Sequence, residues 1–170
     1  SSAASDVYKR QNQNKRHSYN NKKKTNSTKH HKKTHANYAN ENKLDFIVTD
    51  HHKQKETLPD AYAILNPNQN DCNYPFKYLC GCGIGFKLIQ ALDIVHDDWQ
   101  SNIENYLDLV AVAIGADLVP LVGENRTLCH FGLKVINSSP TIGLKAIIRG
   151  INKPEITLSE VSFYIAPRIN

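Results

Sequence analysis

An apolar run that ends in one acid and two histidines constrains this chain more than any other feature. Residues 44–49 are mostly apolar or β-branched, and Asp50, His51 and His52 follow at once. Such a run predicts a short, buried strand of a parallel sheet. Because ligands of open α/β sheets bind beyond the carboxyl ends of the strands, the three polar side chains are predicted to lie in a binding site.

The three side chains offer a particular chemistry. Asp50 supplies carboxylate oxygens, and His51 and His52 supply imidazole nitrogens. This set suits Mn²⁺ or a similar divalent ion and the hydrolysis of phosphoesters. Adjacent histidines also occur on solvated loops, so the tripeptide alone is a weak signal and the neighbouring sequence has to decide.

The chain beyond residue 44 alternates strand and helix patterns, which predicts an α/β fold with a short parallel sheet flanked by helices. A second strand is predicted at 61–65. Helices are predicted to begin near residue 83, to cover 103–114, to begin near residue 124 and to cover 140–148, and a capping box is predicted at 157–160. The helix from residue 124 is expected to bury the apolar side chains of Leu128, Phe131, Val135 and Ile136.

Residues 1–43 have a different composition. They contain eleven Lys or Arg against two Asp or Glu, whereas residues 44–170 contain ten against fourteen, so the overall charge of +5 belongs to the first segment. Asn, Lys, Ser, Thr and His dominate it without a periodic apolar stripe, which predicts a disordered tail. Two interpretations stay open: an arm that binds nucleic acid through its cations, or a linker or artefact.

The cysteines and the hydropathy bear on the compartment. The four cysteines include no Cys-x-x-Cys pair, which favours reduced, mostly buried thiols. No apolar stretch reaches the roughly 20 residues of a membrane span. A reducing, cytoplasmic location without a membrane is the expectation.

Five blocks then follow one another along the chain, at residues 47–61, 64–69, 81–88, 107–126 and 163–170. The first contains Asp50-His51-His52 and the fourth contains Asp117 in the string Gly-Ala-Asp-Leu-Val-Pro. In this order the blocks resemble the RecJ family of DHH phosphoesterases, the single-strand-specific DNA exonucleases. The resemblance implies the C-terminal half of a DHH phosphoesterase domain over residues 44–166. Residues 167–170 are expected to begin a linker helix toward a second domain.

The resemblance also implies roles for the site residues. His51 and Asp117 are the expected metal ligands, so their side chains should lie within about 5–6 Å of each other. His52 is expected to contact the scissile phosphate as a hydrogen-bond donor or as an imidazolium, and Asp50 either to orient the imidazoles or to act on the metal from behind its direct ligands. Because successive residues of an extended chain face opposite ways, His51 and His52 should point to different sides.

Three further residues are candidates for substrate contacts. Gly83 begins a predicted helix, where its backbone N–H could approach a phosphate; close packing of helix and sheet is the alternative. Arg126 and Arg168 are candidates because guanidinium groups prefer phosphate; for Arg126 a salt bridge at the start of its helix is the alternative.

The activity that the resemblance implies is 5′–3′ hydrolysis of single-stranded DNA in repair and recombination, with two Mn²⁺ or Mg²⁺ ions. Single-stranded DNA is the expected substrate, and a single-strand-binding protein and a helicase are further expected partners. Two other functions stay open: a non-catalytic fragment that binds nucleic acid, and a DHH phosphodiesterase that acts on short oligonucleotides.

One departure from the family pattern bears on activity. The family carries an Asp-x-Asp motif and a further Asp upstream of the tripeptide, whereas here only Asp6 and Glu41 are acidic before residue 44. We therefore expect this chain to be part of a larger protein and to be a poor enzyme by itself.

Overall fold

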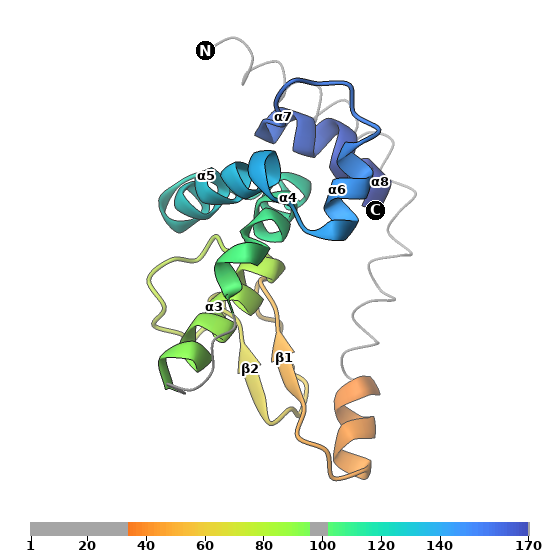
Figure 1. Cartoon of the computed structure of the whole chain (residues 1–170). Coiled ribbons are helices and arrows are strands. Elements are labelled where there is room, and N and C mark those ends of the chain that lie inside the picture. The colour runs from red at the N-terminus through yellow and green to blue at the C-terminus, as the bar shows by residue number, and fades with distance from the viewer. Residues whose placement is uncertain (1–33, 96–101, 170) are drawn as a thin grey trace, which may run out of the picture. The chain divides into compact units, whose positions relative to one another are not determined.

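A computed structural model describes residues 34–95 and 102–169 of the chain (Figure 1). The prediction of a disordered tail falls mostly on residues 1–33, outside the described residues. It is wrong for residues 34–41, which form a helix. Ala36 and Ala39 are buried on this helix, since alanines three residues apart share one helical face and alanine is the best helix former.

Two short strands make the sheet. Strand β1 covers Ile47–Thr49 and strand β2 covers Ala63–Leu65. Phe46 O accepts a hydrogen bond from Tyr62 N–H, and Asp50 N–H donates to Leu65 O. Both pairs advance in the same chain direction, so the strands are parallel, as predicted. The expectation that β1 is fully buried is wrong, because only Val48 of its three residues is buried.

The described chain divides into two compact units. One contains residues up to Val48 together with Glu56–Ala63, and the other contains Thr49–Lys55 and Ile64–Asn170. In the first unit, Asn40 Nδ2 donates to the backbone and to the carboxylate of Asp60, which fastens the helix at 34–41 to the segment before β2. All the predicted site residues belong to the second unit.

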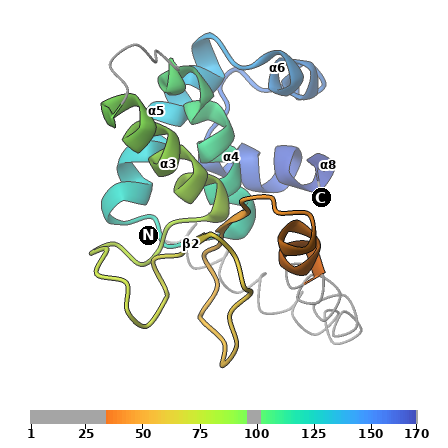
Figure 2. The same ribbon diagram turned by 90° about the horizontal axis from the view of Figure 1, so that it is seen from below.

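Helices make up most of the second unit. They are α3 (Gly81–Val95), the 3-10 turn η2 (Ile103–Tyr106), α4 (Leu107–Asp117), α5 (Gly123–Ser138), α6 (Ile142–Ile148), α7 (Leu158–Glu160), the π-helical turn η3 (Val161–Ile165) and α8 (Ala166–Ile169). The predicted helices are present, with shifted ends. Figure 2 shows α3 alongside α4. No described helix has the length and apolar character needed to cross a membrane.

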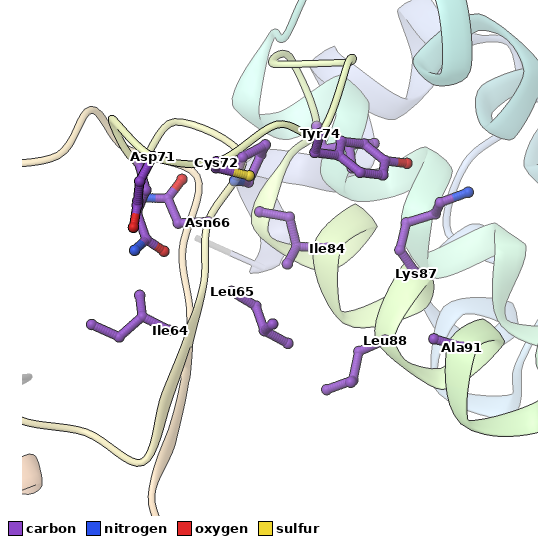
Figure 3. A pocket seen from close by; sticks show the side chains of 13 residues that line it. Ile64, Leu65, Asn66, Asp71, Cys72, Tyr74, Ile84, Lys87, Leu88 and Ala91 are labelled. Atoms are coloured by element: carbon purple, nitrogen blue, oxygen red, sulfur yellow. The ribbon is translucent and has the colours of Figure 1, made fainter. Parts of the chain in front are cut away.

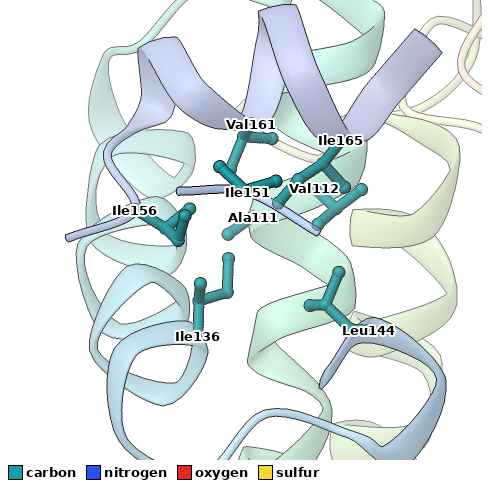
Figure 4. Packing of buried hydrophobic residues seen from close by; sticks show 8 residues of the cluster. All are labelled: Ala111, Val112, Ile136, Leu144, Ile151, Ile156, Val161 and Ile165. Atoms are coloured by element: carbon teal, nitrogen blue, oxygen red, sulfur yellow. The ribbon is translucent and has the colours of Figure 1, made fainter. Parts of the chain in front are cut away.

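An apolar core holds α4, α5, α6 and η3 together. Figure 4 shows side chains from α4, α5, α6, η3 and the connecting loop meeting in one cluster: Ala111, Val112, Ile136, Leu144, Ile151, Ile156, Val161 and Ile165. Asp108 is a buried polar exception beside it, and its Oδ2 accepts a hydrogen bond from Thr141 N–H at 2.7 Å. This bond satisfies the carboxylate and ties α4 to the start of α6.

Helix α5 packs on α4 through a glycine. A Cβ at Gly132 would lie 2.3 Å from Leu107 O and 2.6 Å from Ala111 Cβ, so the two backbones approach more closely than any side chain permits. The buried face of α5 consists of Asn125, Cys129, Gly132 and Ile136. The expectation that Phe131 is buried is therefore wrong: it is 49% exposed because the packing face centres on Gly132.

Candidate metal centre

Asp50 shapes the chain directly after β1. Its Oδ1 accepts hydrogen bonds from His51 N–H at 2.9 Å and His52 N–H at 3.3 Å. The same oxygen lies 2.7 Å from His52 Nδ1. One carboxylate thus turns the backbone and holds the second imidazole. The role expected of Asp50 in the site stays a prediction.

The two histidine rings lie side by side. Their centroids are 4.4 Å apart, so the expectation that they point to different sides is wrong. The cause is the turn at Asp50: residues 50–52 lie beyond the strand, and the alternation of an extended chain does not apply to them. The His52 side chain is 74% exposed, and its Nδ1 faces Asp50. Its Nε2 is the ring nitrogen that does not face Asp50.

His51 and Asp117 come together from distant parts of the sequence. His51 Nε2 lies 3.9 Å from Asp117 Oδ2, which confirms the expected proximity. Asp117 is the last residue of α4, where Leu118 ends the helix with a left-handed backbone (φ 54°). Both side chains are partly open to solvent, at 24% for His51 and 42% for Asp117. Their role as metal ligands stays a prediction.

Two asparagines fix the backbone of the histidines. Asn66 Nδ2 donates to His52 O at 2.8 Å, and Asn68 Nδ2 donates to His51 O at 2.8 Å. Asn66 Oδ1 in turn accepts from Asn68 N–H at 2.9 Å. The loop that follows β2 is therefore hydrogen-bonded to the loop that follows β1 through the two asparagines on either side of Pro67.

The donor set fits half of a divalent metal site. Two ligands that are each about 2.1 Å from one ion are at most about 4.2 Å apart, so the 3.9 Å between His51 Nε2 and Asp117 Oδ2 allows a shared ion. Within residues 34–95 and 102–169, no group of three or more His, Cys, Asp or Glu is placed to hold a metal. His51 and Asp117 together would leave most coordination positions to water.

The start of α3 lies against this pair. A Cβ at Gly81 would be 3.7 Å from His51 Cδ2, so the helix begins in contact with the imidazole. Gly83 is buried, and its N–H donates to Cys80 Sγ at 3.4 Å. That bond occupies the N–H that was predicted to approach a phosphate, which favours the packing interpretation of Gly83.

The two arginines differ in their surroundings. Arg126 is exposed near the start of α5, and within the described part of the chain it forms no ion pair, so the salt-bridge alternative finds no support there. Arg168 Nη1 donates to Ile147 O at 3.0 Å. This bond satisfies a carbonyl at the end of α6, where a cation is favourable. Substrate contact by either arginine stays a prediction.

A pocket of about 440 Å³ lies next to the histidines without including them. Its walls are mainly apolar: Figure 3 shows Leu65 of β2 facing Ile84 and Leu88 of α3. Asn66 and Asp71 lie at the end away from Ala91. Asn66 connects the pocket wall to the candidate metal centre, because its amide also holds His52 O.

A second polar cluster joins α3, α5 and the loop between β2 and α3. Tyr74 Oη donates to Glu124 Oε1 at 2.7 Å, and Lys87 Nζ lies 3.0 Å from Glu124 Oε2. Burial and the hydrogen bond to the Glu124 carboxylate raise the pKa of Tyr74 well above its usual value, so the phenol keeps its proton. Through Lys87 and Glu124 this cluster connects α3 to α5.

The four cysteines are free thiols. The expectation that they are mostly buried is wrong for Cys82, which is exposed, and for Cys72, which is half-buried. Cys80 and Cys129 are buried, and burial raises the pKa of both thiols. Neither thiol is therefore an activated nucleophile.

Sequence reasoning missed the residues that hold the site together. Asn66, Asn68 and Asn125 donate side-chain amides to backbone carbonyls around His51, His52 and Asp117. The sequence feature that could have pointed to them is their position inside the blocks at 64–69 and 107–126. A single asparagine, however, forms no periodic pattern that would mark it as buried.

Comparisons with known proteins show which proteins this chain is similar to. The model of the DHH family, N-terminal domain, matches residues 8–114. The chain is 42% identical over 137 residues to the single-stranded-DNA-specific exonuclease RecJ of Bacillus subtilis (strain 168), covering 79% of this chain and 17% of that protein. It is 39% identical over 139 residues to RecJ of Escherichia coli (strain K12), covering 75% of this chain and 24% of that protein.

A solved structure is similar as well. The crystal structure of exonuclease RecJ bound to manganese superposes with a TM-score of 0.68 at 33% identity, covering 81% of this chain and 34% of that one. The chain thus spans at most about a third of the proteins it matches here. The family match covers more than half of the chain, and the α/β architecture agrees with it. The chain belongs to the DHH family, and the resemblance to RecJ carried by its five sequence blocks is confirmed.

Proposed function

We propose that this chain contributes His51, His52, Asp50 and Asp117 to the active site of a metal-dependent exonuclease. Its substrate is single-stranded DNA, degraded from the 5′ end during repair and recombination in the cytoplasm. The observation that carries the proposal is the 3.9 Å between His51 Nε2 and Asp117 Oδ2, directly beyond the ends of the parallel strands. The relatives, whose names describe exonucleases specific for single-stranded DNA, support the substrate class.

The chain's own residues have separate tasks in this proposal. His51 and Asp117 bind one divalent ion, Mn²⁺ or Mg²⁺, through a nitrogen and an oxygen; the manganese named for the similar RecJ structure supports this ion. When bound, such an ion polarises a phosphoryl oxygen and acidifies water. A second ion would require carboxylates beyond these two ligands.

His52 and Asp50 act on the substrate side. The carboxylate of Asp50 holds His52 Nδ1 at 2.7 Å, which fixes the ring and favours a proton on the nitrogen that faces it. His52 is mostly exposed, so with a proton on Nε2 as well as on Nδ1 it can donate a hydrogen bond from Nε2–H to a non-bridging oxygen of the scissile phosphate. Charge that develops on that oxygen is then stabilised by an imidazole whose orientation is already set.

A nuclease assay tests the proposal. The chain is incubated with Mn²⁺ and linear single-stranded DNA carrying a 5′-phosphate and a label at either end. We expect slow release of 5′-terminal nucleotides, far below roughly 1 s⁻¹, because two ligands hold the ion weakly. His51→Ala should abolish the release. Release that does not need Mn²⁺, or that survives His51→Ala, contradicts the proposal, and fast turnover abolished by His51→Ala contradicts the half-site.

The rival function, binding of nucleic acid without chemistry, has its own signature. The net charge of residues 1–43 would then carry the affinity, since cations release counterions from phosphates. In a gel-shift assay, changing Lys22, Lys23 and Lys24 to Gln should remove most of the binding in the rival case. A complex strengthened by Mn²⁺ and weakened by His51→Ala favours the exonuclease instead.

A further inference from the structure

Two asparagine side chains link the parts of the chain that carry His51 and Asp117. Asn68 Nδ2 donates to His51 O at 2.8 Å and to Lys77 O at 3.1 Å. Asn125 Nδ2 donates to Tyr78 O at 2.7 Å and to Pro120 O at 3.0 Å. Because Lys77 and Tyr78 are neighbours, the two asparagines bind successive backbone carbonyls of one short segment.

We propose that Asn68 and Asn125 are positioning residues that set the separation of the His51 and Asp117 side chains, with residues 77–78 as their common reference. The metal-binding part of this inference rests on the proposed function. The positioning part concerns the geometry of the two side chains and stands without a metal.

The chemistry of the carboxamide explains the choice of residue. Its NH₂ group carries two hydrogens, so one side chain can donate to two carbonyls at once, which no aliphatic or carboxylate side chain does. Lys77 O and Tyr78 O are successive carbonyls, and each accepts a hydrogen bond from a different asparagine. Residues 77–78 therefore connect the loop that carries His51 to the segment that follows Asp117.

The connection from Asn125 to Asp117 is short. Pro120 O, which Asn125 holds, is three residues beyond Asp117, and Leu118 between them has a tight left-handed backbone. Few torsions separate the anchored carbonyl from the carboxylate. On the other side, Asn68 holds the carbonyl of His51 itself. One anchor is thus the backbone of His51 itself, and the other is three residues from Asp117.

The burial of Asn125 argues that this side chain does more than fill space in the core. Its side chain is fully buried in α5, and its Oδ1 has no hydrogen-bond partner among the described residues. An unsatisfied buried acceptor is costly, and an apolar residue at this position would avoid that cost. What such a residue could not supply is the pair of bonds to Tyr78 O and Pro120 O.

A matched control lies on the same helix. Asn137 Nδ2 also donates to two backbone carbonyls, those of Leu133 at 2.9 Å and Ile156 at 2.8 Å. It is twelve residues from Asn125, about 18 Å along the helix. Asn137→Asp removes the same kind of bonds away from His51 and Asp117.

The first arm of the test needs no metal. At one fixed pH, the NMR signal of the His51 Hε1 proton is recorded before and after Asp117→Asn, in the parent, Asn68→Asp, Asn125→Asp and Asn137→Asp chains. We expect Asp117→Asn to move the signal in the parent and in Asn137→Asp. In Asn68→Asp and Asn125→Asp the displacement should fall by about half or more, because the two side chains are no longer held together. Equal displacements in all four chains would overturn the proposal.

The second arm measures Mn²⁺ alone. The dissociation constant, from the concentration dependence of amide-signal broadening, should rise about tenfold or more in Asn68→Asp and Asn125→Asp and change little in Asn137→Asp. An unchanged constant in both site variants overturns positioning. A parent chain that binds no Mn²⁺ overturns the proposed function, while the first arm still decides the positioning. If Asn125→Asp fails to fold, the half-buried Asn68 decides both arms.

Discussion

Two regions of the second unit are held together by different forces. In the helical region, α4, α5, α6 and η3 meet through apolar side chains and the close contact at Gly132. In the site region, residues 51–52, 66–68, 77–78 and 120–125 are joined by side-chain amides that donate to backbone carbonyls. Apolar packing supplies stability without direction, whereas hydrogen bonds supply defined distances. The region that holds His51 Nε2 and Asp117 Oδ2 3.9 Å apart therefore uses hydrogen bonds.

The largest effect is expected in the helical region. Gly132→Ala places a methyl group 2.3 Å from Leu107 O, so α5 must move away from α4. We expect the free energy of unfolding to fall by about 3 kcal/mol, the upper end of overpacking costs. Urea denaturation followed by circular dichroism measures it.

Gly143 offers the control for that substitution. It lies in α6, and nothing is within 4 Å of a Cβ built on it. Gly143→Ala should leave the fold intact and raise the free energy of unfolding by about 0.5–1 kcal/mol, because alanine favours the helix. If the two variants have the same stability, close contact is not what holds the helical region together.

A smaller effect is expected where a polar cap meets the helical region. Thr157 Oγ1 accepts a hydrogen bond from Ser159 N–H at 3.2 Å, and Glu160 Oε2 accepts one from Thr157 N–H at 3.2 Å. Thr157→Ala should lower the free energy of unfolding by about 1 kcal/mol, the usual value of an N-cap. The comparison between the regions predicts this cost to be well below that of Gly132→Ala.

The same cap predicts a pH dependence. Hydrogen bonds from Thr157 lower the pKa of Glu160 in the folded chain. A lowered folded pKa stabilises the fold above the unfolded pKa and loses that effect as the pH falls through the folded value. The stability difference between the parent and Thr157→Ala should therefore shrink in acid, measured by urea denaturation at neutral pH and near pH 3. A difference that grows in acid contradicts the cap.

The sequence predicted the helical region better than the site region. Hydrophobic periodicity located α3, α4 and α5, and the Thr157–Glu160 capping box was recognised from four residues. Phe131 was misplaced because the packing face of α5 centres on a glycine, which contributes nothing to a hydrophobic pattern. The helix at 34–41 was missed because its apolar face consists of two small alanines in a polar segment.

The site region was predictable only in part. The pairing of His51 with Asp117 came from the resemblance and not from periodicity, since 65 residues separate them. The turn that brings the two imidazoles together depends on Asp50 Oδ1 accepting two backbone N–H groups, a local competition that strand alternation does not include. Asn125 was unpredictable because a buried amide with two carbonyl partners is defined by tertiary contacts alone.

The proposed function requires that His51 and Asp117 share one divalent ion. The most direct measurement is a Mn²⁺ titration of the ¹⁵N-labelled chain, in which amide signals near the ion broaden first. We predict that broadening centres on His51, Gly81 and Leu118, and that Asp117→Asn removes it from all three. Broadening centred elsewhere, for example on Asp71 or Glu124, or unchanged by Asp117→Asn, would contradict the account.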